Sequence, residues 1–388
     1  MSSRVPIGIV SWGSSSALGG NQETIWEQYS LPHTNLQHAL TLNNNWVGQL
    51  STSESQAIDR MRLQNKHYRR LDRSVLLGMM AAERALQASQ WGSPSDIGLY
   101  LGTSRGATGS WETYFEAFKS QANSLPPQAS PLTTAGNLAT HTAQHLGIHG
   151  FSSDNSITCS SAFHAIANAM VWLESGRYHR FLAGGTEAPL TPFTLAQMKA
   201  LKIYASSSTE PPYPNRSLQL DKTTNSMVLG EGSAIFALER TPKAPLAWIK
   251  GLGYAREDIS SLTSVSKTGV ALQTAMRQAL SEAELSTVDV IVCHCPGTRV
   301  GDLSEYAAIH TVFGENIPSL TSNKWKIGHT LGASGGLSLE MALLMLKHQT
   351  FVPVPYLTPS SSLSSIQTIM VNALGFGGNA ISIILEQP

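Results

Sequence analysis

The sequence predicts an α/β protein in which a parallel or mixed β-sheet is covered by helices. Short β-prone runs alternate with longer segments whose apolar residues recur at helical spacing. Hydrophobic residues make up 41% of the chain and charged residues only 13%, which suits a large buried interior or a surface partly covered by another subunit. With 388 residues, the chain is long enough for one large domain or two fused halves.

The first part of the chain contains two segments with clear helical signals. Residues 70–90 combine helical spacing with strong helix formers, and residues 162–175 precede Gly176, a common residue just after a helix end. Residues 205–225 are rich in Ser, Pro and Asn and predict a loop. β-Prone runs predict strands over residues 6–12, 97–101, 156–158, 181–184 and 228–238.

A second series of elements begins near Ala247 with a further predicted strand. It continues with a helix over residues 269–283, a strand over 288–293, a helix over 303–313 and a helix after Gly335. Because the strand–helix order resembles that of the first part, we expect a structural duplication. The expected halves are residues 1–240 and 241–388.

Charge, hydropathy and cysteine content exclude several classes of protein. Lys plus Arg equals Asp plus Glu, at 26 each, so no global field attracts nucleic acid or an anionic membrane. No stretch approaches the roughly 20 apolar residues of a membrane span, and the short apolar run near the N-terminus fits a first strand better than a signal peptide. The three cysteines, Cys159, Cys293 and Cys295, are too few for a disulfide framework and favour a reducing, cytoplasmic compartment.

Cys159 is the first candidate for chemistry. It follows a short β-prone run, and a helix of small residues is predicted directly after it. Backbone N–H groups and the helix dipole at such a turn favour an anion, so we expect a lowered thiol pKa and a competent nucleophile. The same N–H groups could bind the oxyanion of a thioester under attack. The alternative interpretation is a buried structural cysteine.

His294 lies where an apolar strand enters a loop, within Val292-Cys-His-Cys-Pro-Gly-Thr298. α/β proteins usually bind ligands at this end of their strands. The Cys-His-Cys sequence also suggests a metal. Adjacent residues of a strand point to opposite faces, however, so these three side chains are poorly placed to share one ion, and we predict no metal site.

Two glycine-rich segments follow. The first, residues 323–336, contains Lys324 and His329 and ends in small residues that permit close helix packing. The second is Gly375-Phe-Gly-Gly378, a turn with one large aromatic residue. Each of these segments by itself is weak evidence, and the second could be any tight turn.

Together the four segments resemble the β-ketoacyl synthase family, in its elongating form with a Cys-His-His active site. The cysteine segment, a His-Gly-Thr-Gly-Thr-like loop, a Lys-x-x-x-x-His segment and a Gly-Phe-Gly-Gly turn occur in family order over nearly the whole chain. Weaker matches are Gly184-Gly-Thr-Glu187, Val228-Leu-Gly-Glu-Gly232 after Asp221, and Gly301-Asp302 with Glu305. The resemblance implies a thiolase-like fold of two duplicated α/β halves in αβαβα layers.

The resemblance also implies a decarboxylative condensation of an acyl thioester with malonyl carried on acyl carrier protein, without a cofactor. Cys159 would carry the acyl group, while His294 and His329 would promote decarboxylation and stabilise the enolate. Lys324 would position His329 and tune its charge, or else be a structural lysine. Backbone N–H groups of Cys159 and Phe376 would form an oxyanion hole, and Phe376 would gate the acyl pocket. Two neutral imidazoles in a dry pocket suit such chemistry.

Three departures from the family pattern indicate a divergent branch. Cys295 and Pro296 replace a glycine and a threonine in the His294 loop, so this loop is stiffer, lacks an N–H donor and could place Cys295 near the site. Thr224-Asn-Ser226 replaces the usual Arg-Asp-Gly, and the C-terminal turn continues with Asn379-Ala380. These changes affect the expected substrate more than the reaction, which could serve fatty acid synthesis or a polyene or polyketide-like pathway.

The resemblance implies two kinds of protein partner. Acyl carrier proteins are acidic, and Arg69, Arg70, Lys199 and Lys202 match the family's basic docking positions, although such charges can also be a solvated helix face. The family forms two-fold dimers through a central strand. The second subunit could be an identical chain or a related synthase-like subunit.

Two other functions compete with the condensing enzyme. A thiolase would need a second, late cysteine, but Gly375-Phe-Gly-Gly378 has none. A non-catalytic partner subunit, such as a chain-length factor, typically lacks the nucleophile. The presence of Cys159, His294, Lys324 and His329 favours the enzyme.

Overall fold

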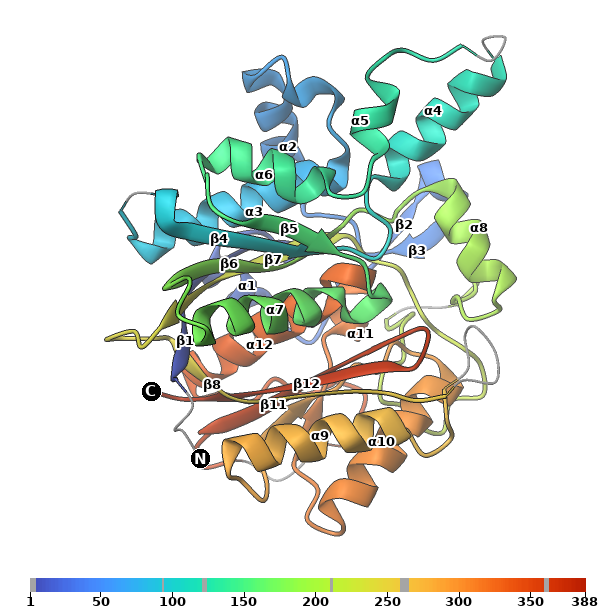
Figure 1. Ribbon diagram of the computed structural model, residues 1–388. Helices are drawn as coiled ribbons and strands as arrows, with labels where there is room; N and C mark the ends of the chain where they lie inside the picture. Colours follow the sequence, from blue (N-terminus) through green and yellow to red (C-terminus); the bar gives the residue numbers. More distant parts are fainter. Residues whose placement is uncertain (1–4, 93, 121–123, 210–211, 259–264, 359–362) are drawn as a thin grey trace.

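Ten strands form the central sheet of the protein, seen here in a computed structural model that describes residues 5–92, 94–120, 124–209, 212–258, 265–358 and 363–388 (Figure 1). Their order is β10-β9-β11-β12-β8-β1-β7-β6-β4-β5. The strands are β1 (Ile7–Ser15), β4 (Ile97–Gly102), β5 (Ser152–Asn155), β6 (Arg180–Glu187), β7 (Gly232–Arg240), β8 (Ala247–Arg256), β9 (Val290–Val292), β10 (Ser319–Thr321), β11 (Thr368–Gly375) and β12 (Asn379–Glu386).

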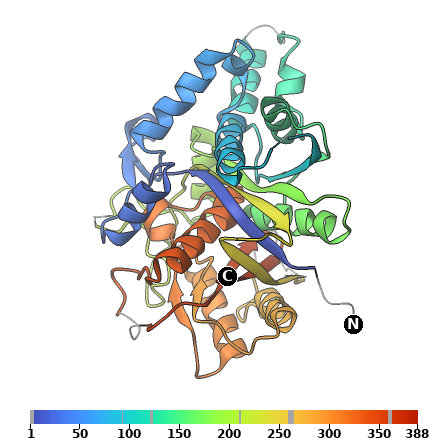
Figure 2. The same cartoon turned by 90° about the vertical axis from the view of Figure 1, so that its left-hand side faces the viewer.

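The two halves of the sheet repeat one topology. The first half has the order β5-β4-β6-β7-β1 and the second has β10-β9-β11-β12-β8. Equivalent pairs also run in the same sense: β4–β5, β4–β6, β9–β10 and β9–β11 are parallel, whereas β6–β7, β1–β7, β11–β12 and β8–β12 are antiparallel. The halves meet where β1 pairs with β8 through only two residue pairs (Figure 2). The expected duplication of a thiolase-like fold is confirmed.

Helices cover and separate the two halves of the sheet, which gives the layered arrangement. α7 (Ser161–Glu174) and α12 (Ser334–His348) contact each other between the halves; α12 is buried from Ser334 to Leu346, whereas α7 is buried along one face (Figure 1). α3 (Arg73–Ser89) covers the outer face of the first half, and α9 (Val270–Ala283) covers that of the second. α3 and α9 fill equivalent places in the repeat, as do α7 and α12.

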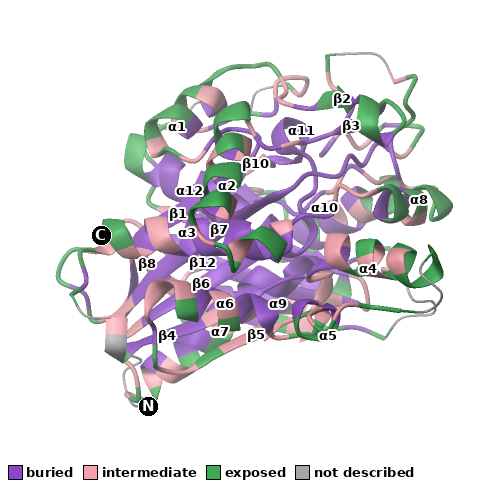
Figure 3. Cartoon of the chain, turned by 90° about the horizontal axis from the view of Figure 1, so that it is seen from above, coloured by how far each residue is buried: buried purple, intermediate pink, exposed green. Residues whose placement is uncertain are grey.

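Apart from the fully buried α11, the remaining helices show exposed faces, as α4 and α8 do in Figure 3. The α-helices are α1 (Gln22–Ser30), α2 (Thr52–Gln64), α4 (Thr108–Ser120), α5 (Ala129–Thr133), α6 (Asn137–Leu146), α8 (Pro192–Ala200), α10 (Arg299–Phe313) and α11 (Lys324–Ile327). Short 3₁₀ turns are η1 (Leu40–Leu42), η2 (Tyr68–Arg70), η3 (Pro94–Asp96), η4 (Thr158–Ser160) and η5 (Leu331–Ala333). β2 (Gln37–Ala39) and β3 (Asn45–Val47) form a separate hairpin.

Most of the predicted elements are present, with shifts of a few residues at their ends. The strand predicted at residues 156–158 is wrong, because the strand there is β5 and η4 follows it. Residues 205–225, as far as they are described, contain no helix or strand, as predicted. No helix in the described ranges is long and apolar enough to cross a bilayer.

Candidate active site

Cys159 lies in the turn η4, directly before α7. Thr158 adopts a left-handed φ of 49°, which turns the chain sharply before the cysteine. Ser161 fixes this turn, because its hydroxyl donates to Thr158 O (2.6 Å) and accepts from Ile157 N (2.9 Å). The thiol is therefore held at the start of the central helix, close to the interface between the two halves.

His329 comes from the equivalent position of the second half, just before η5 and α12. Its Nε2 lies 3.1 Å from Sγ of Cys159. The backbone of His329 is bound on both sides, since its N–H donates to Val228 O (2.7 Å) and its carbonyl accepts from Gly230 N (3.0 Å). The internal repeat thus explains how residues 170 positions apart meet.

His294 completes the cluster from the loop after β9. Its ring stands at 87° to that of His329, with centroids 5.1 Å apart. Burial, together with the nearby Lys324 charge, lowers the pKa of His329 to about 3. Burial lowers the pKa of His294 well below its usual value, with additional lowering from His329 and Lys324. Both imidazoles are therefore neutral at physiological pH.

Lys324 is fully buried, and its charge acts on both imidazoles. Its Nζ donates to Asn323 Oδ1 (2.8 Å) and to Ser338 Oγ (3.0 Å). Burial lowers the pKa of Lys324 to about 8, although Glu305 and the three cysteine thiols oppose this effect. Lys324 acts on His329 through the electrostatic field, and its ammonium group is held by other side chains.

The expectation of a lowered thiol pKa is wrong for this geometry. Burial, with a smaller effect from Glu187, raises the pKa of Cys159 to about 12, although Lys324 and the backbone N–H of Cys159 oppose the rise. The sequence pattern indicates the helix start but not the depth of burial. The thiol is therefore protonated at rest, with a neutral imidazole nitrogen within hydrogen-bonding distance.

Two buried carboxylates, Glu187 and Glu305, bind backbone N–H groups next to the site. The sequence suggested them only as weak family matches. Glu187 accepts hydrogen bonds from Thr103 Oγ1 (3.1 Å), Ser104 N (2.6 Å), Arg105 N (3.2 Å) and Gly332 N (2.9 Å), which joins the two halves. Burial raises the pKa of Glu187 to about 7, despite these four donors.

Glu305 fixes the backbone at His294. It accepts from His294 N (2.9 Å) and Cys295 N (2.7 Å), and Asn372 Nδ2 donates to it over 3.1 Å. The sequence signal for this contact with the His294 backbone is the position of Glu305, which follows the histidine by eleven residues and lies in the next helix. Asn323 and Ser338, which hold Lys324, gave no such signal.

A cavity of about 350 Å³ opens from the catalytic cluster. Its wall is mostly apolar and comes from both halves; the lining residues are Cys159, Met198, Leu201, Ile203, Asn225, Met227, Val265, His294, Pro296, Thr298, Val300, Gly301, His329, Leu331, Leu374, Gly375 and Phe376. Leu201 and Val300 are exposed, with 39% and 60% relative accessibility, so the cavity reaches the surface beside them. Such a cavity suits an extended apolar chain that approaches the thiol.

Phe376 lies on the turn between β11 and β12, at the cavity wall. Its carbonyl accepts from Thr158 Oγ1 over 3.3 Å, so the turn contacts η4 directly. A Cβ atom at Gly375 would lie only 2.0 Å from Thr158 Oγ1, which explains the glycine at this position. The predicted roles of Phe376 in an oxyanion hole and as a gate remain predictions.

Cys293 and Cys295 point away from the cavity and into the core. Their sulfur atoms and a Glu305 oxygen lie within 4.8 Å of one another. As the alternation of a strand predicts, the His294 side chain points to one side, into the cavity, and the two cysteine side chains point to the other. Cys295, which the sequence suggested could project near the site, is fully buried in an apolar cluster instead.

The four predicted docking residues are exposed and lie outside the cavity wall. Lys199 lies in the last turn of α8. Lys202 follows the helix beside the cavity opening, where its carbonyl accepts from Asn225 Nδ2 (2.9 Å). Arg69 and Arg70 form η2; Arg70 borders a surface hollow together with Thr191, the residue that caps α8.

Comparisons with known proteins agree with this site. Residues 11–244 match the family described as "Beta-ketoacyl synthase, N-terminal domain", and residues 246–358 match "Beta-ketoacyl synthase, C-terminal domain". The chain belongs to the β-ketoacyl synthase family.

Among similar proteins is the "Putative polyketide beta-ketoacyl synthase 1" of Streptomyces halstedii, 26% identical with 84% of each chain covered. The "3-oxoacyl-[acyl-carrier-protein] synthase 2" of Staphylococcus aureus (strain MRSA252) is 25% identical, covering 100% of this chain and 99% of the other. A solved β-ketoacyl synthase from Burkholderia phymatum superposes with a TM-score of 0.84 at 22% identity, with 99% of this chain and 100% of that chain covered.

The ishigamide ketosynthase/chain length factor structure also gives a TM-score of 0.84, at 18% identity and with both chains fully covered. These structural similarities establish the fold.

Proposed function

We propose that the chain is a condensing enzyme that joins an acyl thioester to a malonyl unit on acyl carrier protein, with release of CO₂. The observation that carries this proposal is the 3.1 Å approach of His329 Nε2 to Cys159 Sγ, with the second neutral imidazole of His294 beside it. The relatives named polyketide and 3-oxoacyl synthases support the same chemistry.

The first half-reaction loads the acyl group. Sγ of Cys159 attacks the thioester carbonyl while its proton passes to Nε2 of His329, so a buried thiol of raised pKa need not ionise beforehand. Collapse of the tetrahedral intermediate breaks the carrier's C–S bond, and the carrier thiolate leaves and takes up the proton. The acyl chain then occupies the apolar cavity.

The second half-reaction forms the new carbon–carbon bond. The bond between the malonyl carboxylate and its α-carbon breaks, CO₂ leaves and the electron pair forms an enolate. The neutral imidazoles of His294 and His329 donate hydrogen bonds to the enolate oxygen in a desolvated pocket. The α-carbon attacks the acyl carbonyl, and the Cys159 C–S bond breaks as the tetrahedral intermediate collapses. The thiolate then takes up one proton from solvent, which is the proton that the decarboxylative condensation consumes.

Intact-protein mass spectrometry tests the proposal directly. Carrier-bound acyl chains of graded length and saturation are offered, and we expect retained acyl mass on Cys159 followed by release when malonyl-carrier is added. Cys159→Ala should abolish retention, whereas Cys293→Ala, a buried cysteine outside the cavity, should keep it. Condensation that persists in Cys159→Ala would contradict the mechanism, and absence of acylation in the wild type would favour a chain-length-factor-like subunit.

The carrier and a second synthase subunit are the proposed partners. Lys199 and Lys202 beside the cavity opening offer positive charge to an acidic carrier, and Arg69 and Arg70 extend this charge along the surface. β5 ends the sheet, and α4 exposes Trp111 and Phe115 at 57% each, which suits a surface covered by another subunit. The three free cysteines support a reducing, cytoplasmic setting.

A further inference from the structure

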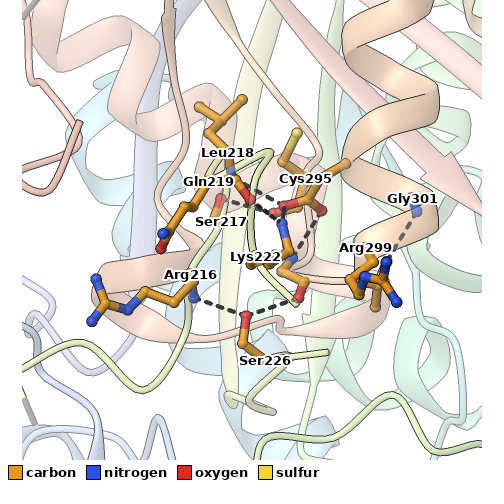
Figure 4. Close-up of polar contacts among 12 residues, drawn as sticks. Arg216, Ser217, Leu218, Gln219, Lys222, Ser226, Cys295, Arg299 and Gly301 are labelled. Carbon is orange, nitrogen blue, oxygen red and sulfur yellow. Dashed lines mark hydrogen bonds and ion pairs between the residues drawn. The ribbon is translucent and has the colours of Figure 1, made fainter. Parts of the chain in front are cut away.

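A loop of residues 215–226, called the 215–226 loop, binds the backbone of the turn that follows His294 (Figure 4). Three of its side chains donate to three consecutive carbonyls of that turn. The contacts are Ser217 Oγ to Cys295 O (2.9 Å), Asn215 Nδ2 to Pro296 O (3.1 Å) and Ser226 Oγ to Gly297 O (2.8 Å). Two of the three departures from the family pattern, at Cys295-Pro296 and at Thr224-Asn-Ser226, lie in these two segments, which therefore contact each other.

A buried ion pair connects the same two segments. Nζ of Lys222 lies 2.7 Å from Oδ2 of Asp302, and their side chains are only 5% and 0% exposed. The Asp302 carboxylate also accepts from Leu218 N (3.0 Å) and Gly297 N (3.1 Å). Asp302 thus holds one backbone group from each segment, and Lys222 supplies the positive charge that a buried carboxylate requires.

The turn that these contacts hold is strained. Cys295, the residue directly after His294, has a φ of 20°, and Leu218 on the facing loop has a φ of 62°. Residues with a Cβ atom rarely adopt such angles unless surrounding contacts impose them. Here both backbone polar groups of Cys295 are bound, the N–H by Glu305 and the carbonyl by Ser217.

The other half of the catalytic cluster has separate supports. Cys159 is fixed by Ser161 within η4, and His329 by Val228 and Gly230. The strand-like segment that carries Val228 is itself anchored outside the loop, because Leu229 accepts from Gly48 N (2.8 Å) and donates to Tyr204 Oη (3.2 Å). Loss of the ion pair should therefore affect His294 more than the Cys159–His329 pair.

We propose that Lys222 is a positioning residue for His294, and that its ion pair with Asp302 holds the strained turn that directs the imidazole toward Cys159. The proposal rests on the condensation proposed above, in which the first half-reaction uses Cys159 with His329 and the second also requires His294. It predicts that loss of the Lys222 charge slows the second half-reaction but not the first, although Lys222 lies outside the cavity wall.

The experiment compares the two half-reactions in Lys222→Met, which keeps the side-chain length and removes the charge. Acylation of Cys159, followed by mass spectrometry, should stay within about 3-fold of wild type, while CO₂ release from malonyl-carrier should fall by about 10- to 100-fold, the scale for a displaced catalytic group. Lys222→Arg, which can still pair with Asp302, should recover most of the decarboxylation. Arg84→Met, which breaks the distant Arg84–Glu54 pair, is the matched control and should slow neither half-reaction selectively.

Equal loss of both half-reactions in Lys222→Met, or unchanged CO₂ release, would overturn the positioning role. A crystal structure of this variant gives a second measurement that does not depend on turnover. In the variant we expect the ring of His294 to shift, so that its centroid no longer lies 5.1 Å from that of His329. An unchanged ring position would overturn the proposal, even if the wild-type chain proved unable to condense.

Discussion

At the scale of single residues, two opposite charges act on the thiol of Cys159. Glu187 raises its pKa and Lys324 lowers it, while burial exceeds both effects. Both charged groups are fully buried, so the solvent screens them little. The reactivity of the thiol should therefore respond to each charge separately and with opposite sign.

Alkylation of Cys159 by iodoacetamide tests this balance. Lys324→Met removes a positive charge, so the thiol pKa should rise further and alkylation near pH 8 should slow by about 10-fold. Glu187→Gln removes a negative charge, so the pKa should fall and alkylation should accelerate. Thr103→Val is the control for Glu187→Gln, since it removes one of the carboxylate's hydrogen bonds without a change of charge.

Rates that move in the same direction in Lys324→Met and Glu187→Gln would show that the electrostatic account is wrong. The sequence predicted the identity of Cys159, His294, His329 and Lys324, because three short motifs specify them. It could not predict the raised thiol pKa, because burial arises from Leu195, Met198 and other residues far away in the chain.

At the scale of elements, the turn between β11 and β12 supports η4 by direct contact. A Cβ atom at Gly375 would meet Thr158 Oγ1 at 2.0 Å and Ile157 O at 3.1 Å. Gly375→Ala should therefore displace the turn that carries Cys159 and slow its acylation by about 10-fold or more. Gly92→Ala is the control, because an added Cβ there meets nothing within 4 Å. Unchanged acylation in Gly375→Ala would mean that η4 tolerates the displacement.

The proposed docking of the carrier involves the surface elements η2 and α8. Arg69→Glu combined with Arg70→Glu should weaken acylation by carrier-bound substrate about 10-fold, because it replaces attraction with repulsion, but should spare a small thioester mimic. Lys243→Glu with Arg277→Glu makes the same charge change on exposed residues elsewhere and serves as the control. Equal loss with carrier-bound and small substrates would contradict docking at η2.

Two physical effects explain why the sequence did not predict α4 and η4. α4 has Trp111, Phe115 and Phe118 on an exposed face, so its apolar residues do not mark a buried side. η4 was mistaken for a strand because Ile157 and Thr158 are β-branched, whereas the left-handed φ of Thr158 is imposed by tertiary contacts. Buried helices such as α3 and α7 were predicted well, since core packing and sequence periodicity agree there.

At the scale of the whole molecule, the internal repeat could be inferred from element order but not from sequence identity between the halves. The strand order required the structure, because parallel neighbours such as β9 and β11 are far apart in sequence. The repeat also explains the site: η4 and η5 precede the equivalent helices α7 and α12, so Cys159 and His329 meet where the halves join.

The open edge at β5 predicts how a second subunit joins. Leu99 N donates to Phe151 O and Thr103 N to Asn155 O, so alternate residues face β4, and the N–H groups of Ser152 and Asp154 face the open edge. Ser152→Pro should reduce dimerisation, seen as a lower mass by light scattering, without loss of β4 pairing. Ser152→Ala keeps the N–H and should leave the mass unchanged. An unchanged mass in Ser152→Pro would place the interface elsewhere.

Buried titratable groups of opposite type should give the whole protein a plateau of stability in mildly acidic solution. The folded-state pKa of His329 is lowered to about 3, so its contribution is present above the unfolded value of 6.5 and is lost as the pH falls. The folded-state pKa of Glu340 is raised from 4.5 to about 7 by burial, so its contribution is present at low pH and is lost as the pH rises through 7.

Glu340→Gln isolates the alkaline side of this plateau. The shift of Glu340 corresponds to roughly 3 kcal/mol of unfolding free energy at full effect, because one pKa unit is about 1.4 kcal/mol. Glutamine can still accept from Trp12 Nε1 and Ser14 Oγ but does not ionise, so the variant should lose less stability than wild type between about pH 4.5 and pH 7. Denaturant unfolding at each pH measures the difference. Parallel curves for the two proteins would show that Glu340 does not titrate in this range, and that its partners keep it in one protonation state throughout.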